Sequence, residues 1–142
     1  MQENYLIHIL GRQEIDGEKD EIKLDTVGAY CQRDGHQYIS YRDYYDESNP
    51  KTYRTTVLKL EGPQKATLLH AGSATRLILE EGKRHYCQYD TGYGTLTIGT
   101  FAQKIENNLH SQGGSLRIHY TLDMNAGFLS FHEISVTIKP MK

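Results

Sequence analysis

Tryptophan is absent from this chain, proline is scarce, and no long apolar run occurs. Of the 142 residues, 3 are proline and 2 are cysteine. The apolar stretch from Tyr5 to Leu10 is interrupted by His8 and is far shorter than the roughly 20 residues of a membrane-spanning helix. The start, Met1 to Asn4, lacks the basic segment of a signal peptide. We therefore expect a cytoplasmic protein that has no contact with a membrane.

Runs of basic residues are also missing, and this bears on the choice of partner. The net charge is −2 and the isoelectric point is near 6.4. Proteins whose main partner is nucleic acid usually carry a basic patch, so nucleic acid is not expected as a partner. Cys31 and Cys87 match no zinc or redox spacing. In the cytoplasm they are expected to be reduced thiols.

Turn signals are abundant from one end of the chain to the other. They separate short runs in which apolar and polar residues alternate, at the spacing of roughly 8–12 residues that is typical of all-β sandwiches and barrels. The apolar fraction of 37% and the mean hydropathy of −0.64 suit a sheet with one face in water. The turn signals are Asp16-Gly17, Asp34-Gly35, Glu61-Gly62-Pro63, Ala71-Gly72-Ser73, Glu81-Gly82, Thr91-Gly92, Gly113-Gly114 and Ala126-Gly127.

The pattern predicts one domain over residues 1–142, an antiparallel meander of about ten short strands closed into a barrel. Closure is favoured because an open sheet of that size exposes two edges. Gly28 lies inside the expected strand 21–31 and indicates a bulge or bend. Tyr93–Ile98 and Phe101–Leu109 are interpreted as two separate strands. In the last hairpin the alternation predicts that Ile118, Tyr120, Ile134 and Val136 face the core.

The seven histidines invite a metal interpretation, but no H-x-H, H-E-x-x-H or His/Cys pairing occurs. His132 is the exception to an otherwise outward or turn placement, because it shares parity with Ile134 and Val136 and should point into the interior. It is either a core histidine bonded to a neighbouring strand or a group that orients a ligand. No metal site, no cofactor and no nucleophile elbow of the G-x-S-x-G type is predicted.

The chain carries a set of characteristic segments, which are 26–30, 38–41, 70–72, 77–80, Gly82, 89–96, Thr100, 113–114 and 116–120. Together they resemble the YwiB-like family of small bacterial proteins, over nearly the whole chain. This resemblance implies a calycin-like β-barrel, related in shape to lipocalins, and implies no activity. Where the family usually has arginine this chain has His70, where it has proline this chain has Gly92, and Arg42 replaces an acidic residue.

Two functions from different classes follow. The first is a binding protein that holds a small apolar ligand inside the barrel or at its mouth, since such barrels can enclose one ligand. The second is a structural or protein-interaction module with a filled barrel, in which a tyrosine-rich strand makes the contact. Enzymatic activity ranks third, because no nucleophile–base signature occurs. Ligand identity and oligomeric state stay open. The predicted ligand-binding residues are Tyr30, Tyr41, His70, Tyr89, Tyr93 and His132.

Overall fold

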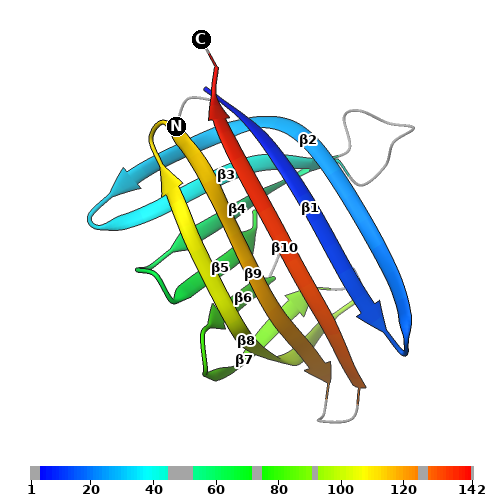
Figure 1. Cartoon of the computed structure of the whole chain (residues 1–142). Coiled ribbons are helices and arrows are strands. Elements are labelled where there is room, and N and C mark those ends of the chain that lie inside the picture. The colour runs from blue at the N-terminus through cyan, green and yellow to red at the C-terminus, as the bar shows by residue number, and fades with distance from the viewer. Residues whose placement is uncertain (1–3, 45–52, 72–74, 91–92, 125–127, 142) are drawn as a thin grey trace.

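A computed structural model describes residues 4–44, 53–71, 75–90, 93–124 and 128–141. In these residues the chain forms ten antiparallel strands, each hydrogen-bonded to its neighbours in sequence, and β1 pairs with β10 to close a barrel. The predicted all-β meander barrel is therefore confirmed, and the architecture is consistent with a calycin-like barrel (Figure 1). The strands are β1 (Tyr5–Ile15), β2 (Glu18–Arg33), β3 (His36–Tyr44), β4 (Tyr53–Leu60), β5 (Lys65–His70), β6 (Arg76–Glu80), β7 (Arg84–Asp90), β8 (Thr95–His110), β9 (Gly113–Met124) and β10 (Phe128–Pro140).

The meander gives the barrel two ends that differ in composition. The base is the end at which β1 begins and β10 ends, and it carries the connections that follow β2, β4, β6 and β8. The mouth is the opposite end, with the connections that follow β1, β3, β5, β7 and β9. No helix in the described ranges is long and apolar enough to cross a membrane.

Two tight turns of the predicted type join strands in the first third of the chain. Asp16-Gly17 and Asp34-Gly35 each hold both residues at positive φ, with values of 52°, 80°, 53° and 78° along the chain. Two consecutive positive φ angles define the type I′ hairpin, whose twist matches that of the flanking strands. These turns fix the register of β1 against β2 and of β2 against β3.

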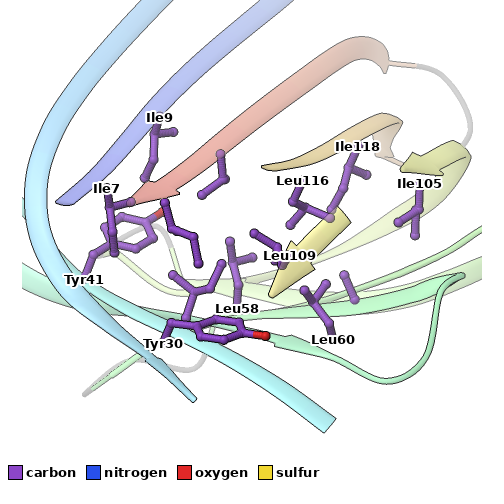
Figure 2. Packing of buried hydrophobic residues seen from close by; sticks show 14 of the residues in the cluster. Ile7, Ile9, Tyr30, Tyr41, Leu58, Leu60, Ile105, Leu109, Leu116 and Ile118 are labelled. Carbon is purple, nitrogen blue, oxygen red and sulfur yellow. The ribbon is translucent and has the colours of Figure 1, made fainter. Parts of the chain in front are cut away.

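The half of the barrel nearer the base is filled by aliphatic side chains. Four of these side chains have no exposed surface, namely Ile39, Leu116, Ile118 and Val136, and Leu60 is 1% exposed. Figure 2 shows Leu60, Leu116, Ile118 and other members of this cluster projecting from several strands toward one another. Two of the four predicted core residues of the last hairpin, Ile118 and Val136, are thus fully buried, whereas Tyr120 and Ile134 are half-buried and pack against the cluster.

Gly28 allows β2 to pair with both β1 and β3. Residues 18–28 of β2 pair with β1, and residues 28–33 pair with β3. A Cβ atom at Gly28 would lie far inside van der Waals contact with the carbonyl oxygen of Ser40 and the Cδ1 atom of Ile7. The absence of a side chain therefore lets the two strands cross closely, as the mid-strand glycine predicted.

The prediction of separate strands at 93–98 and 101–109 is wrong, because residues 95–98 and 101–109 belong to the single strand β8. Gly99 lies inside this strand, and its missing side chain makes room for an ion pair. A Cβ atom there would lie 2.5 Å from Nη2 of Arg84 and 2.8 Å from Oδ1 of Asp123. The strand stays continuous and changes register once, between Ala102 and Lys104.

Side chains replace part of the backbone ladder between β6 and β7. The register joins these strands at one pair, Arg76 opposite Gln88. The Cys87 thiol accepts a hydrogen bond from the N–H of Ile78 at 3.2 Å, and the Thr100 hydroxyl donates to the carbonyl of Ile78 at 2.5 Å. These contacts satisfy buried backbone groups that lack a strand partner.

Truncation of Ile118 tests the core. Ile118→Ala should lower the free energy of unfolding by about 2–5 kcal/mol, because it leaves a cavity among fully buried chains. Leu129→Ala removes a side chain that is 47% exposed and should cost much less. Urea denaturation measures both values, and equal losses would contradict the described packing.

Gly28 and Gly11 form a matched pair of mid-strand glycines. Gly28→Ala should lower the free energy of unfolding by about 1–3 kcal/mol or more through overpacking against backbone. Gly11→Ala should be tolerated, since the nearest atom to its Cβ would be the carbonyl oxygen of Ile22 at 3.9 Å. Thermal melts of the two variants compare them, and an unaffected Gly28→Ala protein would show that β2 does not need this bend.

Candidate ligand site at the mouth of the barrel

The inner lining changes character between base and mouth. Toward the base it is aliphatic, whereas the mouth half presents polar and aromatic groups to the interior. Ile22 faces the interior opposite Gly11 but is 62% exposed, and Leu96 is 43% exposed. Apolar side chains that face inward yet remain accessible show that the barrel is not filled at this end. The inward-facing mouth residues include Gln13, Ile22, Thr56, His70, Tyr120, Ser130 and His132.

A stacked pair of rings forms one wall of the mouth. The register of the last hairpin places Tyr120 of β9 opposite His132 of β10. Their ring centroids are 5.0 Å apart and the planes differ by 11°. The pairing of β9 with β10 is regular along its length, so the backbone holds this wall in place, while β8 changes register opposite Tyr120.

Hydrogen bonds orient the His132 imidazole. Its Nε2 atom lies 2.8 Å from the hydroxyl of Ser130, and that hydroxyl lies 3.4 Å from the carbonyl oxygen of Leu122. A hydroxyl has one proton, so a Ser130 that donates to Leu122 accepts its second bond from the Nε2–H of the imidazole. This arrangement leaves the Nδ1 lone pair of His132 as an acceptor, without a partner among the described residues.

Burial keeps both rings uncharged near neutral pH. Burial lowers the pKa of His132, because desolvation disfavours the imidazolium. Burial also raises the pKa of Tyr120 to about 12, and the neighbouring Tyr89 adds a smaller electrostatic contribution. The wall is therefore aromatic, neutral and equipped with a hydrogen-bond acceptor.

A small cavity opens beside this wall. Its volume is about 180 Å³, and the residues that line it are Gly11, Arg12, Gln13, Ile22, Tyr120, His132, Glu133 and Ile134. At about 30 Å³ for each molecule, this space holds about six waters. Pockets for drug-sized ligands are usually about 300 Å³ or more, so the cavity fits a small ligand or one ring of a larger one.

Four of the predicted site residues form two groups in the structure, and the other two lie apart. His132 lines the cavity, and the half-buried Tyr89 lies near Tyr120. Tyr41 and His70 form a second group on β3 and β5, where each pairs with Thr56 of β4. Tyr41 is buried in the core, and Nδ1 of His70 lies 3.1 Å from the Thr56 hydroxyl.

Tyr30 and Tyr93 lie apart from these groups. Tyr30 is near the base, where its hydroxyl accepts hydrogen bonds from the amides of Gln32 and Gln37 at 2.9 and 2.8 Å. Tyr93 precedes β8 at the mouth and its side chain is fully exposed, at 102%. The structure therefore does not bring these two tyrosines to the cavity.

The expectation that His132 differs from every other histidine by facing inward is wrong. His70 pairs with the buried Thr56 and shares its inward face. Because β5 is short and lacks a clear apolar alternation of its own, its facing is set by pairing with β4 rather than by a pattern visible in the sequence.

The sequence predicts Tyr120 as a core residue, and it does not predict Gln13 or Ile22 as ligand-binding residues. The signal for Tyr120 lay in the hairpin register, which pairs it with His132. No cluster of three or more His, Cys, Asp or Glu side chains suited to a metal ion occurs within the described ranges.

This chain belongs to the structural class of closed antiparallel β-barrels whose interior is accessible at one end. Within that class the chain belongs to the family described as "Domain of unknown function (DUF1934)", whose pattern matches residues 7–136. No curated protein matches the chain.

Two solved structures are similar to the chain. The ywiB protein from Bacillus subtilis has 19% sequence identity and a TM-score of 0.82, covering 97% of this chain and 92% of its own. At this identity the likeness shows a shared fold. A protein of unknown function from Bacteroides ovatus has 12% identity and a TM-score of 0.36, over 98% of this chain and 44% of its own, which carries no structural argument.

His132 gives the site a pH signature. Its pKa is lowered in the folded state from an ordinary value near 6.5, so the unfolded chain binds the proton more readily. The stabilising contribution is present above about pH 6.5 and is lost as the pH falls below it.

The melting temperature of the wild type should therefore drop between pH 7 and 5, and His132→Phe should weaken that dependence. Substitution of the exposed His110 by Phe serves as the control and should leave the dependence as in the wild type. An unchanged slope in His132→Phe would contradict the buried imidazole.

Proposed function

We propose that this protein binds a small, uncharged and largely apolar ligand on the inner face of the barrel mouth. The stacked, neutral pair of Tyr120 and His132 beside an accessible cavity is the observation that carries the proposal. Aromatic rings contribute a large apolar surface with little loss of side-chain entropy, and this makes them common in ligand pockets. The ring pair carries no charge and so favours a neutral ligand over an anion or a cation, whereas Arg12 and Glu133, which also line the cavity, belong to the outward-facing parity of β1 and β10.

The polar groups at the cavity define what the ligand would present. Nδ1 of His132 is placed to accept a hydrogen bond, so it favours a ligand with a hydroxyl or N–H group. Gln13 has its Cα opposite that of His132 and offers an amide at the same level of the barrel. A flat, apolar molecule with one donor group matches this set.

The other predicted ligand-binding residues differ in how directly they would contact a ligand. Tyr89 lies beside Tyr120 and would extend the aromatic wall. His70 shares the inward face of β5 and would contact a ligand longer than the cavity, whereas the buried Tyr41 would support that side of the barrel from the core. Tyr93 would approach such a ligand only from the rim, and Tyr30 would act by holding the base rather than by contact.

A second candidate is an interaction module whose barrel holds no ligand. The filled base and the small size of the cavity, about 180 Å³, favour this alternative. Small barrels can be filled completely by their own side chains. The two functions differ in whether a small molecule stabilises the folded protein.

Binding of 2-naphthol compared with naphthalene separates these functions. The two probes have the same ring system, but 2-naphthol adds one hydroxyl donor. Both should raise the melting temperature, because a ligand that binds the folded state stabilises it. The hydroxyl should give 2-naphthol about five-fold tighter binding, the effect of one net hydrogen bond.

His132→Phe should keep an aromatic wall and remove that preference between the two probes. His110→Phe is the matched control and should retain it. No stabilisation by either probe at millimolar concentration, together with no bound ligand in native mass spectrometry of freshly purified protein, would contradict the proposal and support the interaction module.

A further inference from the structure

The mouth half of β2 has a strand on one side and an open edge on the other. Residues 18–28 pair with β1, and pairing with β3 begins at Gly28. Within the described ranges no strand pairs with the other side of residues 18–27. Figure 1 shows this part of β2 as the outer strand of its hairpin with β1. An unpaired edge of this length presents a row of backbone donors and acceptors to whatever approaches.

The turn geometry determines which residues present those groups. The two-residue turn Asp16-Gly17 makes Ile15 and Glu18 a hydrogen-bonded pair, so the even-numbered residues of β2 bond to β1. The odd-numbered residues then direct their N–H and C=O groups to the open side. In agreement, the N–H of Glu21 bonds to the Asp20 carboxylate at 2.8 Å rather than to β1.

We propose that this edge is the contact surface for a second copy of the chain, joined by antiparallel pairing of β2 with β2 about a two-fold axis at Ile22. This register places Glu21 opposite Lys23 of the partner subunit. It also places Lys19 opposite Asp25 of the partner subunit. Each of these pairs occurs twice across the axis, and each joins opposite charges on the outer face of the sheet.

Charge favours this register over the two adjacent ones, which have the axis at Glu21 or at Lys23. A two-fold axis at Glu21 would place Glu21 opposite its own copy and Lys19 opposite a lysine. An axis at Lys23 would place Lys23 opposite its own copy and Glu21 opposite an aspartate. Like charges directly opposite one another destabilise a strand pair, whereas opposite charges contribute about 0.2–1 kcal/mol each. The sequence of β2 is therefore self-complementary about Ile22.

Exposure and apolar contact agree with the proposed pairing. The side chains of Lys19, Lys23 and Asp25 are 82%, 67% and 81% exposed. Ile22 is 62% exposed and would meet its copy at the axis. Because the attraction is between surface charges, the association should be weak and should weaken further as salt is added.

Charge reversal and its compensation test the proposal in solution. Sedimentation equilibrium of the wild type at low salt should show a monomer–dimer equilibrium. Lys23→Glu places two glutamates opposite each other at both symmetric positions and should raise the dissociation constant about ten-fold or more. The double variant Glu21→Lys with Lys23→Glu restores opposite charges and should recover most of the lost affinity.

Lys104→Glu is the matched control, since it reverses the charge of a lysine that is 63% exposed on β8. Circular dichroism of each variant verifies the fold. A wild type that is monomeric up to about 1 mM would overturn the proposal. An equal effect of Lys104→Glu would also overturn it, because the association would then depend on net charge. If the β2 edge binds only a different protein and never a second copy of this chain, the occupant is an extended peptide of that protein. This result would also overturn the proposal.

Cross-linking tests the register itself. In an antiparallel pair the Cα atoms of opposite, non-hydrogen-bonded residues are about 4.5 Å apart, within the range of a disulfide. Ile22→Cys should therefore form a covalent dimer under mild oxidation. Leu24→Cys would lie opposite Asp20 of the partner subunit and far from its own copy, so it should not. Cys31 and Cys87 are present in both variants and give the same background. Equal yields would overturn the register.

Discussion

The close crossing of β2 over Ile7 and Ser40 at Gly28 is the constraint on which the rest of the barrel depends. One strand must pair with β1 along its first part and with β3 along its second, and only a residue without a side chain fits at the crossing. Beyond this point toward the base, the sheet closes around aliphatic side chains. Before it, β2 leaves β3, exposes one edge and brings Ile22 to the accessible side of the mouth. The closed base, the open edge and the cavity are therefore consequences of one backbone feature.

The division of the interior follows from that geometry. At the base, Ile39, Leu116 and Val136 exclude water completely and account for the stability of the fold. Polar side chains there link the strands, because the amide of Gln37 bonds to the Tyr30 hydroxyl and to the carbonyl of Leu109. At the mouth, the imidazole of His132 is half-buried, neutral and bonded through one nitrogen. A barrel that is filled at one end and accessible at the other can be stable and still have room for a ligand.

Much of the fold is predictable from the sequence, because alternation and turn chemistry are local properties. Asp16-Gly17 and Asp34-Gly35 predicted their hairpins, Gly28 predicted the bend, and the alternation around Ile118 and Val136 predicted the core. The predicted break between residues 98 and 101 is wrong for a physical reason. Gly99 lies inside the continuous strand β8, where its missing side chain makes room for the ion pair of Arg84 with Asp123.

The candidate site was less accessible to sequence reasoning because its members come together through register. The inward facing of His132 followed from parity, whereas its stacking on Tyr120 required the pairing of β9 with β10. Tyr30 and Tyr41 face the interior, but parity does not say how far along the barrel axis a residue lies. This is why Tyr30 was grouped with residues of the opposite end.

The most direct measurement of the central claim is an NMR titration of isotope-labelled protein with 2-naphthol. The largest backbone shift changes are expected at Gly11, Ile22, Tyr120 and His132, which line the mouth cavity, while Leu60 and Leu116 at the base should stay unchanged. Shift changes confined to the outer face around the exposed Phe131, or the absence of any saturable change, would contradict a ligand site inside the mouth.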